Sequence, residues 1–380
     1  MRKRLSRFAF IVIAIVLLAY CYVGFELGVQ GLFWLALACP VLAMLWLPLI
    51  YWKKENGRDT GFDHFMQWAS YYSMAFYSFA LGFLVLRRVL IAGLWIAQVP
   101  YTLLVGKEGT LAVLGLIGLA LIVGTLLARV RPRVRKVEIP IEGLPAQFVG
   151  MKIVQISDLH VGPTIKRAFV ERVVKIVNKL GADLVALTGE IFDGEVESLR
   201  REVAPLSTLE STYGSFYVTG NHEYYWDAPG WIIEATRLKM TPLLNAHRKI
   251  EKDGGVLILA GVPDYAAKLI GGTEDSDPKK ALGVVPEKPR PLKILLAHQP
   301  RLAPVAASAG FDLQLSGHTH GGQFFPWTYI VRFFQPFVSG LNRSGKMWVY
   351  VSQGTGYWGP PVRLGARSEI TLVKLVQATR

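Results

Sequence analysis

Two histidines separated by one residue stand between glycines in the sequence Gly317-His318-Thr319-His320-Gly321. In an extended turn the side chains of His318 and His320 point to about the same side, so both imidazoles can face one polynuclear metal centre. The glycines allow the backbone to approach an ion or a phosphate group closely. A His-x-His pair alone is weak evidence, because solvated loops carry such pairs as well. The chemistry that the pair suggests is metal binding.

Further polar clusters precede this pair, and each one follows an apolar run that we interpret as a buried strand. The clusters are Asp158-Leu159-His160 after residues 153–156, Gly189-Glu190-Ile191-Phe192-Asp193 after 184–187, Gly220-Asn221-His222-Glu223 after 216–218, and His298 after 294–297. Five of the seven histidines of the chain belong to these clusters and the pair. The other two, His64 and His247, lack such a context and are interpreted as ordinary loop histidines.

The order and chemistry of the clusters resemble the calcineurin-like metallophosphoesterases, whose pattern is DxH, GDxxD, GNH(D/E), a single His and GHxH. The resemblance covers about residues 150 to 375 and implies a two-sheet α/β sandwich flanked by helices, with metals at the strand ends. It also implies a set of ligands around each of two ions: Asp158, His160 and His320 for one, Asn221, His298 and His318 for the other, and residue 190 as the bridge.

A pair of divalent ions suits phosphoester hydrolysis, because it lowers the pKa of a bound water and neutralises phosphate oxygens. A mixed nitrogen and oxygen ligand set favours Mn, Fe or Zn over Ca, and we expect Mn by preference. By the same resemblance, His222 is the candidate general acid or phosphate-orienting group. Asp193 and Glu223 would orient imidazoles by accepting their other N–H. The alternative for either carboxylate is a plain helix start.

One position departs from the family pattern, since Glu190 stands where the bridging Asp is expected. The extra methylene moves the carboxylate by ~1.5 Å. This shift is enough to disturb a centre whose ions lie ~3.5–4 Å apart, unless the backbone compensates. The sequence leaves three consequences of Glu190 open: reduced activity, an altered metal preference, or a chain substituted to slow turnover.

The globular part is expected to occupy residues 151–380. Short β-type runs alternate there with amphipathic segments at residues 165–180 and 198–210, which indicates an α/β layered fold. Later runs are spaced more closely and predict a second, mixed sheet. Residues 271–288, rich in Gly, Asp, Pro and Lys, are interpreted as a surface excursion. Residues 129–150, with three prolines among alternating basic and apolar residues, are interpreted as a basic linker.

The N-terminal region, residues 1–128, is expected to be a transmembrane helical region. The chain is 52% hydrophobic with a mean hydropathy of +0.33, too apolar for a purely soluble enzyme. Apolar runs at 8–27 and 31–51 are each long enough to cross a hydrocarbon core of ~30 Å. A third region, 66–105, is interrupted by Arg87-Arg88, and a fourth run covers 110–127. We predict about four spans, with residues 89–105 re-entrant, interfacial or an extension of the third helix.

Basic residues cluster before the first span, after the second and after the last, ending at Lys136. With four spans these clusters share one side, which the positive-inside rule makes cytoplasmic. Five spans would place the densest cluster outside. The N-terminal run resembles a cleavable signal, but Tyr20 occupies the place of the small residue that cleavage needs. We therefore expect a multi-pass protein of the inner (cell) membrane, with its catalytic domain on the cytoplasmic face.

The net charge of +14 does not indicate nucleic-acid binding. Residues 1–136 hold 15 Lys and Arg against 5 Asp and Glu, and the remainder holds 27 against 23. The basic excess therefore belongs to the membrane flanks, where it favours anionic headgroups, and the expected partners are membrane lipids. Both cysteines, Cys21 and Cys39, lie in apolar spans, which fits the cytoplasm. The sequence does not indicate an oligomeric state.

The aromatic stretch at residues 324–337 follows the histidine pair directly. It is either an amphipathic element that guides a lipid substrate to the metals or a segment packed against the sheet. The motif Gly354-Thr355-Gly356-Tyr357-Trp358-Gly359-Pro360-Pro361 resembles the bacterial membrane-anchored branch of the family. Some relatives in that branch cleave the pyrophosphate of a UDP-linked diacylglucosamine.

The sequence thus predicts a membrane-embedded, two-metal phosphohydrolase that acts on a phosphorylated, lipid-linked phosphoester or pyrophosphate. One alternative is a phosphodiesterase for a soluble nucleotide that is tethered only for location. Another is a weakly active phosphate-ligand sensor, because Glu190 replaces the usual bridging Asp. The presence of His222 favours an enzyme, because a pure binder needs no general acid.

Overall fold

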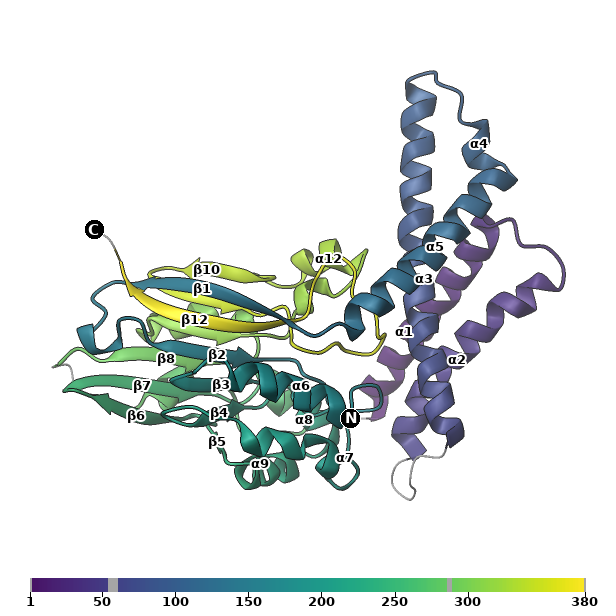
Figure 1. Cartoon of the computed structure of the whole chain (residues 1–380). Coiled ribbons are helices and arrows are strands. Elements are labelled where there is room, and N and C mark those ends of the chain that lie inside the picture. Colours follow the sequence, from purple (N-terminus) through teal and green to yellow (C-terminus); the bar gives the residue numbers. More distant parts are fainter. Residues whose placement is uncertain (1, 54–60, 286–288, 379–380) are drawn as a thin grey trace. The chain divides into compact units, whose positions relative to one another are not determined.

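The computed structural model describes residues 2–53, 61–285 and 289–378, with side chains described for 13–45, 61–285 and 289–378 (Figure 1). The chain forms two compact units. The helical unit contains residues 1–129 together with the short segments 324–326 and 359–364. The α/β unit contains residues 130–323, 327–358 and 365–380.

The first sheet of the α/β unit has, over the described residues, the strand order β1-β12-β2-β3-β4-β5. Strands β2 to β5 run parallel, β12 is antiparallel to β2, and β1 is parallel to β12. The parallel strands therefore end at one edge of the sheet. The bounds are β1 (Arg133–Ile141), β12 (Glu369–Gln377), β2 (Lys152–Ile156), β3 (Leu184–Thr188), β4 (Ser215–Val218) and β5 (Met240–Pro242).

The second sheet has the order β10-β11-β9-β8-β7-β6 in the described part of the chain. It is mixed, as predicted, because its four central strands are parallel and its two edge strands are antiparallel. The bounds are β10 (Gly340–Ser344), β11 (Met347–Val351), β9 (Leu313–Ser316), β8 (Leu292–Leu296), β7 (Gly255–Gly261) and β6 (Ala246–Lys252).

The main core lies between the two sheets, where alternate residues of both are buried together, among them Ile153, Ala186, Leu259, Ile294 and Val373. Because side chains alternate across a strand, each sheet can supply one face of this core while its other face packs against helices. The predicted two-sheet α/β sandwich is confirmed.

Short helices cover the outer faces of the sheets. In α6 the buried residues Val170, Val173, Val174 and Val177 recur at helical spacing and form its packed stripe. The predicted segments 165–180 and 198–210 correspond to α6 and to α7 with the turn that follows it. The bounds are α6 (Arg167–Asn178), α7 (Val196–Val203), α8 (Asn221–Trp226), α9 (Ala228–Arg237), α10 (Pro278–Leu282), α11 (Ala303–Ser308) and α12 (Trp327–Ile330).

The linker interpretation of residues 129–150 is wrong for residues 133–141, which form the edge strand β1. Val137, Ile139 and Ile141 lie two residues apart, so they share one face and pack into the core between the sheets. Pro140 is tolerated because an edge strand has one side without ladder hydrogen bonds. The alternation of basic and apolar residues was therefore a strand signal.

The helical unit contains α1 (Arg2–Glu26), α2 (Phe33–Lys53), α3 (Gly61–Ile96), α4 (Thr102–Val105) and α5 (Lys107–Arg129). Among the described residues, α3 and α5 are long and apolar enough to cross a bilayer. The described apolar stretches of α1 and α2, Ile13–Glu26 and Phe33–Leu45, are shorter than the ~20 residues that a span needs. The prediction of about four spans is thus corrected to two candidate spans within the described residues.

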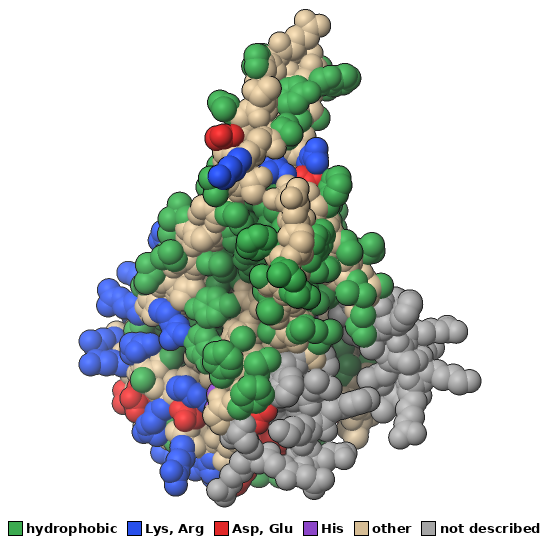
Figure 2. All heavy atoms as spheres, turned by 90° about the vertical axis from the view of Figure 1, so that its right-hand side faces the viewer, with side chains coloured by type: hydrophobic (Ala, Val, Ile, Leu, Met, Phe, Trp, Pro, Cys, Tyr) green, Lys and Arg blue, Asp and Glu red, His purple; other side chains and the backbone are tan. Residues whose placement is uncertain are grey.

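Many apolar side chains of the helical unit are exposed, and they gather over its helices in Figure 2. Trp95, Ile96, Leu103 and Ile122 are among them. An exposed apolar area of this extent is rare in a monomeric soluble protein and marks a surface for lipid or for another chain.

Helix α3 runs without a break through Arg87 and Arg88, which the sequence suggested would interrupt it. Both guanidinium groups bind the carboxylate of Glu26 at the end of α1, at 2.8 Å from Arg87 and 2.6 Å from Arg88. This counter-charge allows the basic pair to remain in an apolar helix. Residues 89–96 extend the third helix, which was one of the predicted alternatives.

The aromatic stretch at 324–337 divides between the two units. Phe324 and Phe325 pack in the helical unit, with ring centroids 5.4 Å from Phe79 and 5.3 Å from Phe83, respectively. Residues 327–337 belong to the α/β unit and carry exposed aromatic side chains: Trp327, Tyr329, Phe333 and Phe334. Neither predicted alternative therefore describes the whole stretch.

Candidate metal centre

All ten predicted site residues lie just beyond the ends of five strands of the α/β unit. The ends of β2, β3 and β4 in the first sheet and of β8 and β9 in the second bring them together. Nine of the ten are buried and His318 is half-buried. The members are Asp158, His160, Glu190, Asp193, Asn221, His222, Glu223, His298, His318 and His320.

Five of these residues have positive φ angles: Asp158 at 52°, His160 at 49°, Glu190 at 51°, His318 at 73° and His320 at 51°. Non-glycine residues adopt this left-handed conformation rarely and at a cost of about 1–3 kcal/mol each. Such strain persists only where the surrounding structure imposes it. Its concentration at these positions favours a functional role for the turns.

Hydrogen bonds between the turns hold them in this conformation. The backbone N–H groups of Asp158 and His160 donate to the carbonyls of Gly189 and Glu190, each at 3.0 Å. The N–H of His318 donates to the Asp158 carboxylate at 2.8 Å. The turns after β2, β3 and β9 are therefore one connected unit that spans both sheets.

Glu190 lies between two groups of potential ligands. In the first group, the ligand atoms of Asp158, His160, Glu190 and His320 all lie within 4.8 Å of one another. The carboxylate oxygen Oε2 of Glu190 is 3.0 Å from His160 Nε2 and 3.8 Å from His320 Nε2.

The second group consists of Glu190, His298 and His318, whose ligand atoms also lie within 4.8 Å of one another. Here the other carboxylate oxygen, Oε1, is 3.4 Å from Nε2 of His298. Each oxygen of the Glu190 carboxylate thus faces one group. This is the arrangement that a bridging carboxylate requires, although the side chain is longer than that of Asp.

Several buried atoms of the cluster have no hydrogen-bond partner among the described residues. They are Oδ2 of Asp158, Oδ1 of Asn221, Nε2 of His298 and Nδ1 of His318. A buried polar atom without a partner costs about 1–3 kcal/mol. Carboxylate, amide and imidazole atoms are also ligands for divalent transition metals. The donor set therefore fits metal ions, which would satisfy these atoms.

The charged and buried groups of the cluster shift one another's pKa values strongly. Burial lowers the pKa of His160 and His298, but the carboxylate of Glu190 outweighs burial and raises both to about 10. For the Glu190 carboxyl, burial raises the pKa, and the facing imidazoles outweigh it and hold the pKa well below its usual range. Burial lowers the pKa of His318 to about 3, which keeps this imidazole neutral, the form that binds metals.

Asp193 positions His222. The Asp193 Oδ1 atom is 3.0 Å from Nδ1 of His222 and accepts a hydrogen bond from Nε1 of Trp226 at 2.9 Å. The other nitrogen of His222, Nε2, is directed at the cluster and lies 3.7 Å from Oε1 of Glu190. Burial lowers the pKa of His222, but Asp193 and Glu190 outweigh it and raise the pKa above its ordinary value. The imidazole can therefore present a proton to a group bound beside Glu190.

The predicted role of Glu223 as an imidazole-orienting group is wrong. Its carboxylate accepts hydrogen bonds from backbone N–H groups of Gly220 at 2.7 Å, Ile191 at 2.8 Å and Phe192 at 3.2 Å. The alternative of a helix-start carboxylate is the correct one, because Glu223 is the third residue of α8 and caps its first turn. Glu223 shapes the turn that carries Glu190.

The backbone passes so close to the ligands that two positions must be glycine. A Cβ atom at Gly220 would lie 2.6 Å from Cγ of Glu190, and one at Gly317 would overlap the carboxylate of Asp158. The extra carbon of Glu190 therefore occupies space that Gly220 leaves empty.

The motif at 354–361 has a structural role that the sequence did not reveal. Gln323 and Trp358 exchange two hydrogen bonds, from Gln323 Nε2 to the Trp358 carbonyl and from the Trp358 N–H to Gln323 Oε1, both at 2.9 Å. The Trp358 ring lies 5.8 Å from the His222 ring, and its side chain is half-exposed. Gln323, three residues after His320, is the residue in the sequence that could have indicated this contact with the motif.

Comparisons with known proteins place the chain among metallophosphoesterases. The profile described as calcineurin-like phosphoesterase matches residues 151–322. An uncharacterized metallophosphoesterase of Aquifex aeolicus is 33% identical over 246 residues, which cover 64% of this chain and 91% of that protein. A dimetal phosphatase from Danio rerio of known structure is 12% identical, with a TM-score of 0.34 over 54% of this chain and 88% of that chain.

A longer relative is the "Transmembrane protein with metallophosphoesterase domain" of Danio rerio. It is 41% identical over 256 residues, which cover 65% of this chain and 58% of the relative. The chain thus spans less than two thirds of the length of this relative.

Proposed function

The chain belongs to the calcineurin-like phosphoesterase family, and we propose that it is a metal-dependent, membrane-embedded phosphohydrolase with two metal ions. Its substrate would be a lipid-linked phosphoester or pyrophosphate, such as a UDP-linked diacylglucosamine. The observation that carries the two-ion proposal is the position of Glu190, with one carboxylate oxygen toward each ligand group.

The residues divide between the two ions as follows. Asp158, His160 and His320 would hold one ion, and Asn221, His298 and His318 the other, with Glu190 between them. The unpartnered atoms of Asp158, Asn221, His298 and His318 support this division, since both groups contain them. Manganese is the ion that we propose, and iron or zinc would suit the same donors.

When bound, two divalent ions would lower the pKa of a bound water and neutralise the charge of a phosphate group. The chain's own residues would do the rest. Asp193 fixes the imidazole of His222 through Nδ1, so that Nε2 can donate a proton to the leaving oxygen. The raised pKa of His222 favours the protonated form that this step needs. His222 is thus the proposed general acid.

Two features support a substrate at the membrane surface. The helical unit carries two candidate spans and a broad exposed apolar surface. Four residues after His320 the chain enters the core of that unit at Phe324 and then returns to the α/β unit at Trp327. The exposed aromatic side chains that follow are suited to the headgroup region, where aromatic rings concentrate.

We propose that the α/β unit lies on the cytoplasmic face of the inner membrane. Two candidate spans, like four, return the chain to its starting side, so the basic residues before α3 and after α5 share one side. A reporter fused after Arg131, between α5 and β1, tests this. A fluorescent cytoplasmic reporter is expected, and an active periplasmic reporter at the same position would reverse the assignment.

Turnover tests the catalytic proposal. The full chain in detergent is expected to hydrolyse bis(p-nitrophenyl) phosphate with saturable dependence on Mn²⁺, and a chelator should abolish this activity. Glu190→Asp is the matched variant. Comparable turnover of both chains would show that Glu190 bridges competently. Turnover by the Glu190→Asp variant alone would overturn the proposal for the natural chain and favour the sensor alternative.

Lipid preference needs a separate assay. In mixed micelles, kcat/KM for a UDP-linked diacylglucosamine should exceed that for soluble UDP-N-acetylglucosamine. Replacing the exposed Phe333 and Phe334 by Ser should reduce this preference, whereas Leu269→Ser, at an equally exposed apolar position in another loop, should not. Equal kcat/KM for both substrates would contradict a lipid-linked substrate and indicate a tethered enzyme for soluble nucleotides.

A further inference from the structure

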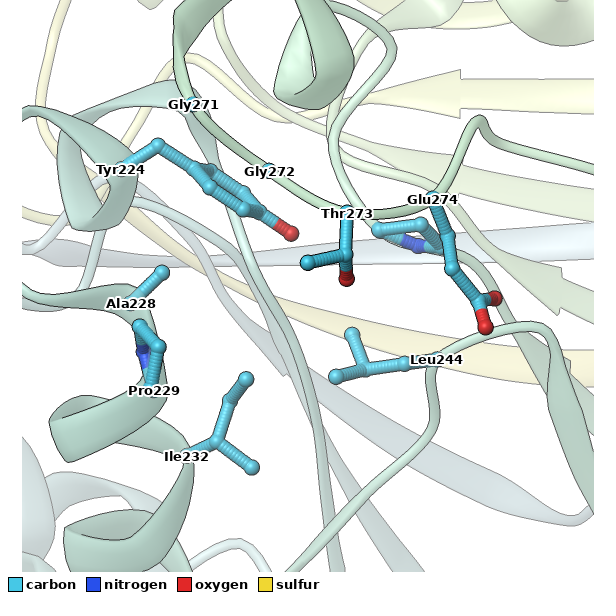
Figure 3. Close-up of a pocket in the computed structure, with 10 residues that line it drawn as sticks. Tyr224, Ala228, Pro229, Ile232, Leu244, Gly271, Gly272, Thr273 and Glu274 are labelled. Atoms are coloured by element: carbon cyan, nitrogen blue, oxygen red, sulfur yellow. The ribbon is translucent and has the colours of Figure 1, made fainter.

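A cavity of about 240 Å³ lies in the α/β unit (Figure 3). Four segments line it: the end of α8, the first half of α9, the chain just after β5 and the loop that follows β7. One side is apolar, formed by Ala228, Pro229, Ile232, Leu244 and Pro263. The other side carries polar groups from Tyr224, Thr273 and Glu274.

Figure 3 shows how these groups face the cavity. The hydroxyl groups of Tyr224 and Thr273 point to the same space, and Ile232 and Leu244 face it from α9 and from the chain after β5. Apart from Tyr224, the polar side belongs to residues 271–274, the start of the segment that the sequence marked as a surface excursion, residues 271–288. These four residues form a wall of the cavity instead of projecting freely.

Two connections join the cavity to the Asn221 and His298 side of the metal centre. On α8, Tyr224 lies three residues after Asn221, a spacing that makes the two side chains neighbours on a helix. On the other wall, Pro263 precedes Asp264, whose carboxylate accepts hydrogen bonds from Gln299 at 3.0 and 3.1 Å. Gln299 directly follows His298.

The polar wall is held in place by its own contacts. Oε2 of Glu274 accepts hydrogen bonds from Asn245 at 2.9 Å and from Lys280 at 3.0 Å. Gly272 lies against the Tyr224 ring so closely that a Cβ there would be 2.8 Å from Cε1 of the ring. The loop packs against the Tyr224 ring and is held by its own hydrogen bonds, so this wall of the cavity is fixed in position.

The chemistry of the walls restricts the ligand. The Glu274 carboxylate is paired with Lys280 at 3.0 Å and can still accept hydrogen bonds, and no Lys or Arg is among the described residues that line the cavity, so a second phosphate group is disfavoured. An acyl chain would offer no hydrogen bond to the Thr273 hydroxyl, nor a second one to the Tyr224 hydroxyl, which already shares a hydrogen bond of 3.1 Å with Thr219. The volume is below the ~300–1,000 Å³ of sites that enclose a whole drug-sized ligand. One ring with an apolar face and several hydroxyl groups satisfies all three conditions.

We propose that this cavity binds a sugar ring of the substrate, next to the phosphate group that is cleaved. This inference rests on the proposed function, because it names part of the substrate of the same site. The apolar face of the ring would pack on Ile232 and Leu244, and its hydroxyl groups would donate to Glu274 and exchange hydrogen bonds with Tyr224 and Thr273. The ring can be the ribose of a nucleotide or a hexose.

Substrate comparison tests the proposal. The substrates are bis(p-nitrophenyl) phosphate, which has no sugar, the p-nitrophenyl ester of thymidine 5′-phosphate, which has a pentose, and UDP-N-acetylglucosamine, which has a pentose and a hexose. Ile232→Trp fills the cavity without changing a residue of the metal centre. The matched control is Ile233→Trp on the same helix, where the natural side chain is 72% exposed and does not line the cavity.

We expect Ile232→Trp to raise KM at least tenfold for the substrates whose sugar occupies the cavity, with turnover of bis(p-nitrophenyl) phosphate unchanged. An effect on UDP-N-acetylglucosamine alone would show that the hexose occupies the cavity. An effect on both sugar substrates would show that the pentose occupies it. Glu274→Gln should raise the same KM values by a smaller factor. Unchanged KM values, or an equal loss with all three substrates, would overturn the proposal.

Binding separates this inference from the proposed function. Isothermal titration calorimetry of the full chain in detergent with Mn²⁺ measures the Kd for UDP-N-acetylglucosamine whether or not hydrolysis occurs. Tenfold weaker binding in Ile232→Trp, but not in Ile233→Trp, supports the cavity even if the natural chain hydrolyses none of the substrates. Equal binding by the two variants contradicts it even if turnover is normal.

Discussion

The two units of the molecule each bury a cluster of charged side chains, and they satisfy it differently. In the helical unit, both carboxylate oxygens of Glu26 bind guanidinium groups, of Arg87 at 2.8 Å and Arg88 at 2.6 Å. In the α/β unit, Oδ2 of Asp158 and Oδ1 of Asn221 have no partner within the described residues. One cluster satisfies its acceptors with the chain's own cations, whereas the other leaves acceptors for a bound ion.

The atoms left without partners differ in kind as well. In the described part of the helical cluster they are donors, Nε and Nη1 of Arg87. In the metal centre they are carboxylate, amide and imidazole atoms, which are the atoms that coordinate cations. A buried polar cluster therefore indicates a metal site only when its unpartnered atoms are potential ligands that converge. This contrast can be tested by removing the central carboxylate of each cluster.

The largest effect is expected from Glu190→Gln. An amide cannot replace the charge of a carboxylate between two ions, so several kcal/mol of transition-state stabilisation should be lost. This corresponds to a decrease of about 10³-fold in kcat. Steady-state turnover of bis(p-nitrophenyl) phosphate measures it. A Glu190→Gln chain with natural turnover would show that the carboxylate does not bridge.

Glu26→Gln should leave metal content unchanged but destabilise the helical unit. Removing one partner of a buried ion pair costs ~3–5 kcal/mol, because Arg87 keeps its charge with the side chain only 8% exposed. Denaturant unfolding of the detergent-solubilised chain measures this change. Glu108→Gln, at an exposed position in α5, is the control and should change stability little. Equal stability of both variants would remove the contrast between the clusters.

Asp193→Asn should weaken the metal centre less than Glu190→Gln, because Asp193 acts through imidazoles: its Oδ1 holds His222, and its Oδ2 lies 3.5 Å from Nδ1 of His160. Loss of such a partner typically costs about 10–100-fold in metal affinity or activity. Measuring turnover against Mn²⁺ concentration separates an effect through His160 from an effect through His222. A raised half-saturating Mn²⁺ concentration indicates His160, and a lowered kcat at saturating Mn²⁺ indicates His222. If neither quantity changes, Asp193 has no positioning role.

Arg88→Gln should have the smallest effect. The Arg88 side chain is 50% exposed, and ion pairs at exposed positions contribute only ~0.2–1 kcal/mol. Denaturant unfolding should therefore show a much smaller loss than for Glu26→Gln, since Arg87 still neutralises the carboxylate. A loss as large as that of Glu26→Gln would show that the cluster needs both cations.

The sequence predicted which side chains lie together, because these residues stand at fixed places after short apolar strands. Parallel strands end at one edge, so clusters such as Asp158-x-His160 and Asn221-His222 had to meet there. The role of Glu223 was not predictable in the same way. Its partners are backbone N–H groups from the turn after another strand, and no residue type or spacing encodes such a contact.

The remaining differences have physical reasons too. The strand β1 was taken for a linker because basic residues and Pro140 hid its alternation, and its pairing with β12 joins residues more than 200 positions apart. The aromatic stretch was treated as one element although residues 324–326 and 327–337 belong to different units. Hydrophobicity alone does not tell which of two apolar environments a phenylalanine enters.

The central claim is that Glu190 lies between two metal ions, and metal stoichiometry tests it most directly. The full chain in detergent would be saturated with Mn²⁺, freed of excess ion and analysed by inductively coupled plasma mass spectrometry, with Glu190→Gln and His298→Ala beside it. Two ions per natural chain and one or fewer in each variant are expected. A natural chain that binds no Mn²⁺, or variants that still bind two ions, would contradict the claim.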